Sequence, residues 1–163
     1  MKYMEHAVIL FVAVLFGLLS VALIVGVVHT IIVESNSSQA LFHQGTIPHQ
    51  LPDGFYKGKV SADIPRGSWQ GKVFSATAAT GTNQFDGAQR YHFKMYPAKG
   101  LRDKHTDVLR IDYRQPGNPL WLSFIVDEVV LTRPGHFLGK VHLHIAGLTF
   151  TLAYFELDKS VTN

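Results

Sequence analysis

The sequence contains no cysteine. This absence excludes thiol catalysis, disulfide bonds, iron–sulfur clusters, cysteine-bound zinc and covalent attachment of c-type haem. Any folded domain in the chain is therefore held together by its hydrophobic core and its backbone hydrogen bonds alone.

Motifs of catalysis are missing as well. The chain has no P-loop, HExxH sequence, dinucleotide-binding fingerprint or nucleophile elbow. Because nothing in the sequence places a nucleophile beside a base and a group that orients it, we expect neither an enzyme nor a bound cofactor.

Net charge is low. The 163 residues include 15 Lys and Arg against 12 Asp and Glu, which gives a formal charge of +3. An excess this small and dispersed does not indicate nucleic-acid binding. Beside a membrane, a mild positive excess favours contact with anionic lipid head groups.

Residues 7–33 form one long apolar run, AVILFVAVLFGLLSVALIVGVVHTIIV, without Asp, Glu, Lys or Arg. A helix of this length measures about 40 Å, whereas the hydrocarbon core of a bilayer is about 30 Å thick. The run is longer than the apolar region of a signal peptide, and no A-x-A cleavage site follows it. The sequence predicts an uncleaved, single-pass transmembrane helix.

Basic residues predict how this helix is oriented. Lys2 precedes it, and no Lys or Arg follows it until Lys57. The positive-inside rule therefore places residues 1–6 in the cytoplasm and the rest of the chain outside, in the periplasm if the cell is bacterial. We expect a protein of the cell (inner) membrane.

Small residues lie on two faces of the predicted helix. Ala13, Gly17 and Ser20 share one face, and Ala22 and Gly26 lie on roughly the opposite one. Small residues let helix backbones approach closely, so these faces suit packing against other transmembrane helices of a complex. The alternative is that Gly and Ala are simply common in membrane helices.

His29 lies in the last apolar turns of the helix. An ionisable residue in a membrane segment is a candidate functional residue, here as a ligand for the metal of a haem or chlorin. The alternative is a histidine that reaches water near the membrane surface.

The remainder divides into a polar linker, residues 34–50, and a β domain, residues 51–163. Alternating apolar and polar residues predict seven or eight antiparallel strands separated by Gly, Pro and Asn turns. We expect a small up-and-down β-barrel, with a β-sandwich as the alternative. Seven residues are candidates for its core or for contact with an apolar ligand: Trp69, Tyr91, Phe93, Leu109, Tyr113, Phe137 and Leu143.

Two short motifs resemble the signatures of lipocalins. Gly67-Ser68-Trp69, at the start of a predicted strand, looks like the G-x-W motif, and Ile111-Asp112-Tyr113 is similar to the T-D-Y motif. The resemblance implies an up-and-down barrel whose mouth takes a lipid or another apolar ligand, with Trp69 closing its base.

Three histidines share one face of a predicted strand. His136, His142 and His144 have the same parity as Lys140, and apolar residues fill the opposite parity. We interpret this as a solvated face. A metal site and a pH-sensitive contact surface are the alternatives.

Charged residues mark two further places. Asp127 and Glu128 interrupt an apolar run, so we expect a bend there or an ion pair with a base such as Arg110 or Arg133. A basic hairpin is a candidate surface for lipid head groups or an acidic partner, with a solvated turn as the alternative. Its basic residues are Lys94, Lys99, Arg102 and Lys104.

Three functions are compatible with these features. The first is a non-enzymatic accessory subunit whose helix packs in a membrane complex while the β domain braces its extracytoplasmic side. The second is a membrane-tethered binder of a lipid or other apolar ligand. The third is a metal-dependent enzyme that uses the histidine face.

Overall fold

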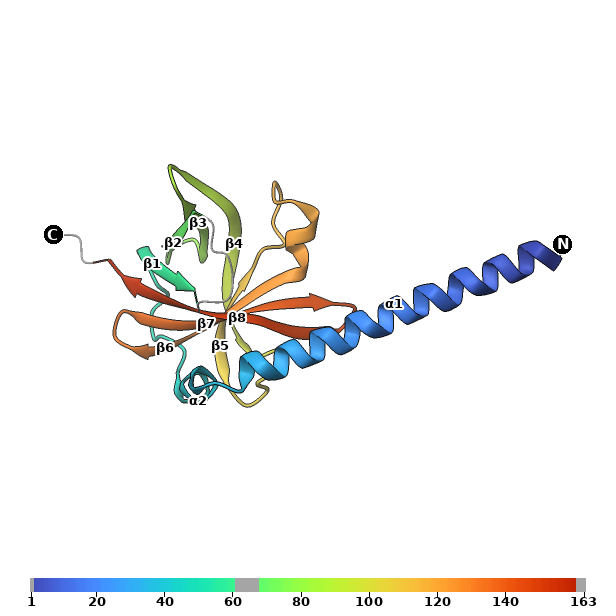
Figure 1. Ribbon diagram of the computed structural model, residues 1–163. Coiled ribbons are helices and arrows are strands. Elements are labelled where there is room, and N and C mark those ends of the chain that lie inside the picture. The colour runs from blue at the N-terminus through green and yellow to red at the C-terminus, as the bar shows by residue number, and fades with distance from the viewer. Residues whose placement is uncertain (1, 61–67, 161–163) are drawn as a thin grey trace.

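A computed structural model describes residues 2–60 and 68–160. It consists of a long helix, α1 (Lys2–Glu34), a short helix, α2 (Ser37–Gln44), and a β-barrel. Figure 1 shows α1 projecting from the side of the barrel, so that most of its length extends beyond the domain. The N-terminal helix and the β-barrel predicted from the sequence are both confirmed.

α1 is the one helix in the described residues that is long and apolar enough to cross a membrane, over Tyr3–Glu34. Among the described residues, most side chains of α1 are exposed, and its last turns meet the barrel at β8. An apolar helix with no covering partner is unfavourable in water, which supports the predicted membrane span. The side of the membrane that holds the barrel stays a prediction.

The sheet is a closed barrel in which each strand pairs antiparallel with the next and β8 pairs back with β1. Closure rules out the β-sandwich alternative and leaves no free sheet edge. The eight strands are β1 (Gly54–Val60), β2 (Trp69–Ser75), β3 (Thr80–Phe85), β4 (Ala88–Lys99), β5 (Asp107–Asp112), β6 (Ile125–Arg133), β7 (His136–Ile145) and β8 (Leu148–Lys159).

A core of packed side chains fills part of the barrel interior. Phe93, Leu109 and Phe137, three of the predicted core residues, are buried in this core together with other aromatic and aliphatic residues. Its rings meet edge to face, as between Phe74 and Phe93 at 5.5 Å. The predicted core residue Leu143 is half-buried and does not belong to this cluster.

The segment predicted as a polar linker differs from the expectation. Residues 37–44 form α2, whose first turn is capped by Asn36, because the Asn36 Oδ1 accepts a hydrogen bond from Ser38 N at 2.8 Å. Phe42 on this helix is fully buried against Val130, Leu138 and other apolar residues on the outer surface of the barrel. The predicted linker thus contains a short helix that packs on the barrel.

The apolar stretch 120–131 does not form one continuous strand. Its first residues form a 3-10 turn, η1 (Leu120–Phe124), before β6 begins. Only after that turn does the segment join the barrel, where Val126 and Val129 are buried.

Candidate functional site

Beside this packed core, the barrel interior holds a cavity of about 290 Å³ that is open on one side. It lies at the end of the barrel where β2, β4 and β6 begin. Its walls are almost entirely apolar, and its lining includes Val60, Trp69, Phe85, Tyr91, Leu122, Ile125, Val141, Leu152, Ala153 and Phe155.

Trp69 and Lys72 both face this cavity although they are three residues apart on one strand. A β-bulge between Trp69 and Gly71 makes this possible, because it shifts the register of β2 against β3. Gly71 has φ +145, and a Cβ at this position would lie 2.0 Å from the carbonyl oxygen of Tyr56. Only glycine fits at this position, so Gly71 permits the bulge that turns the side chains of Trp69 and Lys72 toward the cavity.

Tyr91 reaches the cavity through a second irregularity. The register of β3 and β4 shifts between Gly81 and Asn83, and Tyr91 adopts φ +61. A left-handed backbone is uncommon for an aromatic residue and is associated with functional sites. The Tyr91 ring packs edge to face with Phe85 at 5.6 Å and with Trp121 at 6.1 Å.

A polar cluster lies on the inner wall of the cavity. Lys72 Nζ is 2.8 Å from Asp127 Oδ2 and donates to Asn83 Oδ1 at 2.9 Å. Tyr113 contacts Lys72 Nζ through its hydroxyl, which donates to Asp127 Oδ2 at 2.7 Å. Trp69 Nε1 also donates to Asn83 Oδ1. The ammonium and the carboxylate compensate each other, so the cavity has polar groups but no net charge from this pair.

Burial sets the protonation behaviour of this cluster. It lowers the pKa of Lys72 despite the opposing charge of Asp127, and it raises the pKa of Tyr113 well above its usual range. The Tyr113 hydroxyl therefore stays a neutral hydrogen-bond donor at any physiological pH.

The predicted solvated face on β7 is wrong for its two central residues. Lys140 and His142 are fully buried, because the C-terminal end of α1 and the helix α2 cover this part of the barrel wall. Lys140 Nζ lies 2.6 Å from Asp103 Oδ2 and 3.3 Å from Glu34 Oε1. The Phe42 ring centroid is 4.7 Å from the same nitrogen, a distance suited to a cation–π contact.

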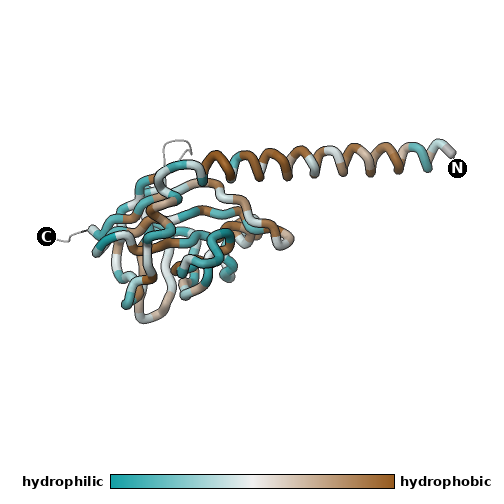
Figure 2. The backbone as a smooth tube through the Cα atoms, turned by 90° about the horizontal axis from the view of Figure 1, so that it is seen from below, coloured by the Kyte–Doolittle hydropathy of each residue, from teal (hydrophilic) through white to brown (hydrophobic). Residues whose placement is uncertain are grey.

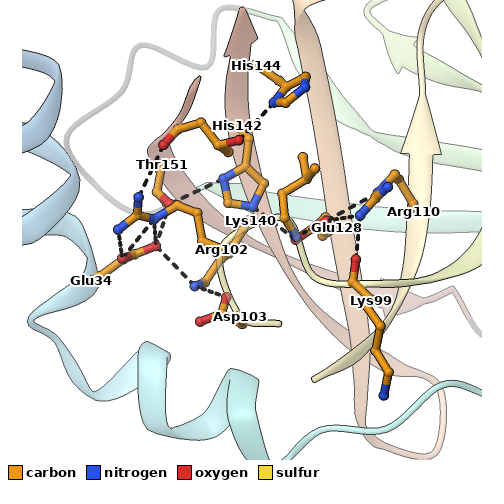
Figure 3. Close-up of polar contacts among 12 residues, drawn as sticks. Glu34, Lys99, Arg102, Asp103, Arg110, Glu128, Lys140, His142, His144 and Thr151 are labelled. Atoms are coloured by element: carbon orange, nitrogen blue, oxygen red, sulfur yellow. Dashed lines mark hydrogen bonds and ion pairs between the residues drawn. The ribbon is translucent and has the colours of Figure 1, made fainter. Parts of the chain in front are cut away.

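Figure 3 shows that these contacts continue as one network between α1 and the barrel. Arg102, in the loop between β4 and β5, donates from Nε and Nη2 to the Glu34 carboxylate at 3.0 Å. Thr151 Oγ1 also donates to Glu34, and the Thr151 N–H donates to Thr30 Oγ1 at 3.0 Å. We call Glu34, Arg102, Asp103, Lys140 and Thr151 the clasp.

Glu128 extends the network on the outer wall, whereas its neighbour Asp127 faces the interior. Glu128 Oε1 accepts from Arg110 Nη2 at 3.0 Å and from the Leu101 N–H at 2.8 Å. His142 Nε2 lies 3.2 Å from the other carboxylate oxygen. The predicted ion pair with Arg110 is confirmed, and the partner of Asp127 is Lys72.

The histidines have separate partners. His136 Nδ1 is 2.6 Å from Asp158, and His144 Nδ1 is 2.8 Å from Thr149 Oγ1. His29 Nε2 donates to the carbonyl of Leu152 at 2.9 Å, which joins α1 to β8. No group of three His, Cys, Asp or Glu side chains in residues 2–60 and 68–160 is arranged to hold a metal ion.

The small residues of α1 differ in their surroundings. A Cβ at Gly26 would lie 2.8 Å from the Phe150 ring, so this glycine packs against the chain's own barrel. Gly17, by contrast, has no other atom within 4 Å of the position its Cβ would take. The face of Ala13, Gly17 and Ser20 therefore stays uncovered, and the face of Ala22 and Gly26 is covered at Gly26.

The predicted basic hairpin carries three exposed lysines, Lys94, Lys99 and Lys104. Lys99 pairs with Asp107 at 2.7 Å, and Arg102 belongs to the clasp. Of the lipocalin-like motifs, Trp69 lies at the cavity end of the barrel and lines the cavity, instead of closing the opposite base. Gly67 lies outside the described residues. Tyr113 lines the cavity as part of its polar cluster.

Comparisons with family models, with curated proteins and with solved structures found no match for this chain.

Replacement of Lys72 by Met tests whether the buried ion pair is structural. The variant leaves the Asp127 carboxylate buried without its cation, which costs about 3–5 kcal/mol of unfolding free energy. We expect a large drop in the thermal midpoint of the purified full chain. Lys72→Met combined with Asp127→Leu removes both charges and should recover most of the loss. A double variant as unstable as the single one would contradict this account.

Acid should weaken the outer network. Burial alone would raise the pKa of Glu128, but contacts with His142, Leu101 and Arg110 outweigh it and hold the pKa below its ordinary value of 4.5. At a pH between the lowered pKa of the folded protein and the ordinary value of 4.5, this carboxyl group is more protonated in the unfolded chain than in the folded one. The free energy of unfolding therefore decreases as the pH falls through that interval. We expect the thermal midpoint to decrease once the pH is below about 4.5.

The control for this prediction is Glu128→Gln, which cannot titrate at this position. Its stability at neutral pH should be lower than that of the unchanged chain, and its loss of stability on acidification should be smaller. Equal pH profiles for the two proteins would show that Glu128 does not contribute.

Proposed function

We propose that this protein is a membrane-anchored binding protein for a neutral, apolar molecule, held inside the barrel. The observation that carries the proposal is the open cavity of about 290 Å³ with apolar walls inside the barrel. Ligand sites are commonly concave, mostly apolar and furnished with a few placed polar groups, which describes this cavity.

The polar cluster indicates the chemistry of the ligand. Lys72 is compensated by Asp127, so a charged ligand group would enter a buried site without a free counter-ion, which is costly. The Tyr113 hydroxyl and the Asn83 amide also face the cavity, but they already hydrogen-bond to Lys72, Asp127, Trp69 and each other. A ligand that is mostly hydrocarbon, such as a chain with one alcohol, ester or carbonyl group, meets these requirements.

The size of the cavity narrows the class further. Its volume lies near the lower end of the range of about 300–1,000 Å³ that is usual for small-molecule sites. The site therefore suits one chain or one compact ring system, and a lipid with two chains would leave part of itself outside.

A photoactivatable long-chain alcohol tests the proposal in the full chain reconstituted in lipid nanodiscs. We expect crosslinks on cavity-lining peptides, mapped by mass spectrometry. Ala153→Leu places a larger side chain in the cavity and should reduce these crosslinks at least about tenfold, equivalent to about 1.4 kcal/mol of binding free energy. Crosslinks to the lipid-exposed part of α1 serve as the internal reference and should not change.

Ala40→Leu is the matched control, because it makes the same substitution at an exposed position on α2. It should leave the cavity crosslinks intact. Crosslinks confined to α1 in the unchanged chain, or equal cavity labelling in Ala153→Leu and Ala40→Leu, would refute the proposal.

A role as an accessory subunit of a membrane complex is the second candidate, and the open face at Gly17 favours it. This glycine leaves room for the backbone of another helix to approach α1. Gly17→Leu fills that space without touching the barrel, so it should reduce co-purification of a membrane partner in mild detergent. A lone monomer with the unchanged sequence would count against this role.

A further inference from the structure

Three contacts between β8 and α1 fix the position of the barrel along the axis of α1. The Phe150 ring packs on Gly26, the Thr151 N–H donates to Thr30, and the Leu152 carbonyl accepts from His29. Toward the start of β8, Phe150 therefore meets a residue of α1 that lies farther from Glu34 than the residues that Thr151 and Leu152 meet. Leu148, at the start of β8, borders the same surface groove as Leu23 and Val27.

This position places the hairpin between β7 and β8 at the depth of the membrane. Gly26 lies about 12 Å from Glu34 along the helix axis, and Leu23 lies about 16 Å from it. A hydrocarbon core of about 30 Å accommodates about 20 helical residues. A span that begins at Ala7 therefore still contains Gly26, and the hairpin tip reaches the level of the apolar core.

The hairpin tip has the composition that this depth requires. Residues 141–153 contain no Asp, Glu, Lys or Arg. Ala146 and Gly147 both have positive φ, which gives a tight two-residue turn. On either side of the turn, Ile145 and Leu148 leave 42% and 49% of their surfaces exposed.

η1 presents a second exposed apolar group on the same side of the barrel. Leu120 is 82% exposed and Trp121 56%, with Phe124 beside them. Figure 1 shows this turn and the β7–β8 hairpin on the side of the domain that faces the N-terminal half of α1, and Figure 2 colours the hairpin tip as hydrophobic. We call Leu120, Trp121, Phe124, Ile145 and Leu148 the rim.

Charge near the rim agrees with a membrane surface. Lys104 borders the groove formed by Val27, Ile31 and Leu148, and it is exposed. An exposed lysine beside apolar residues can extend its ammonium group to lipid phosphates. Residues 129–155 contain no acidic side chain that would be repelled there.

We propose that the rim is inserted in the lipid leaflet on the domain's side of the membrane. The barrel is then partly embedded in the bilayer beside α1. η1 contributes Leu122 to the cavity lining and Trp121 to the ring contact with Tyr91. If the proposed function is correct, an apolar ligand enters the cavity from the lipid at this edge, without crossing water.

The absence of cysteine permits a direct test with single nitroxide labels. The full chain is reconstituted in protein-free vesicles of phosphatidylethanolamine and phosphatidylglycerol, with one label on Leu148→Cys or Trp121→Cys. Leu41→Cys is the matched control, since Leu41 on α2 is 52% exposed but lies away from the rim. Leu15→Cys reports on the lipid around α1.

We measure the accessibility of each label to oxygen, which concentrates in lipid, and to a water-soluble nickel complex. The ratio of oxygen to nickel accessibility at positions 148 and 121 should be several-fold higher than at position 41 and should approach that at position 15. Ratios at 148 and 121 equal to that at 41 would overturn the proposal, whether the rim then faces water or awaits a protein partner.

The outcome is separable from that of the proposed function. Rim labels in water together with cavity crosslinks to the long-chain alcohol would leave the binding function standing and refute insertion of the rim. Rim labels in lipid without cavity crosslinks would support insertion of the rim and refute the binding function. A water-exposed label at position 15 would refute both insertion of the rim and the membrane anchor.

Discussion

The contacts that attach the barrel to its helix centre on one buried ammonium group, that of Lys140. Two carboxylates from different parts of the chain, Glu34 at the end of α1 and Asp103 in the loop between β4 and β5, converge on it. Because the group is fully buried, loss of both carboxylates would leave its charge uncompensated in a medium of low polarity. The barrel is therefore held in one orientation on α1, and this orientation sets the depth of the rim.

A second buried lysine has the same physical requirement on the inner side of the barrel wall. Lys72 is neutralised by Asp127 within the cavity, and Lys140 is neutralised outside it, so each pair specifies one arrangement of its elements. The difference between them is their surroundings. Helices cover Lys140, whereas apolar walls and an open space border Lys72. The contacts of Lys140 thus position the domain, whereas the pair of Lys72 and Asp127 shapes the cavity.

The sequence predicted the helix and the strands better than it predicted which side chains pair with one another. Period-two alternation located most strands, and the pairing of Glu128 with Arg110 followed from the cost of a buried carboxylate. Lys72 was missed, although it shares its strand face with Phe74, and Asp127 likewise shares a face with Val129. A lysine and an aspartate on two core-facing strand sides are the signal that could have located the cavity cluster. Nothing in the order of residues linked Asp103 to Lys140.

The sequence by itself determined the long apolar helix, the antiparallel strands and the absence of cysteine chemistry, because these depend on composition and on local periodicity. The tertiary structure decided which side chains are buried. Lys140 and His142 have the parity of an outer face, and they are buried only because α1 and α2 fold back over that face. Burial and pairing depend on contacts between residues far apart in the chain, and a local pattern carries no information about those contacts.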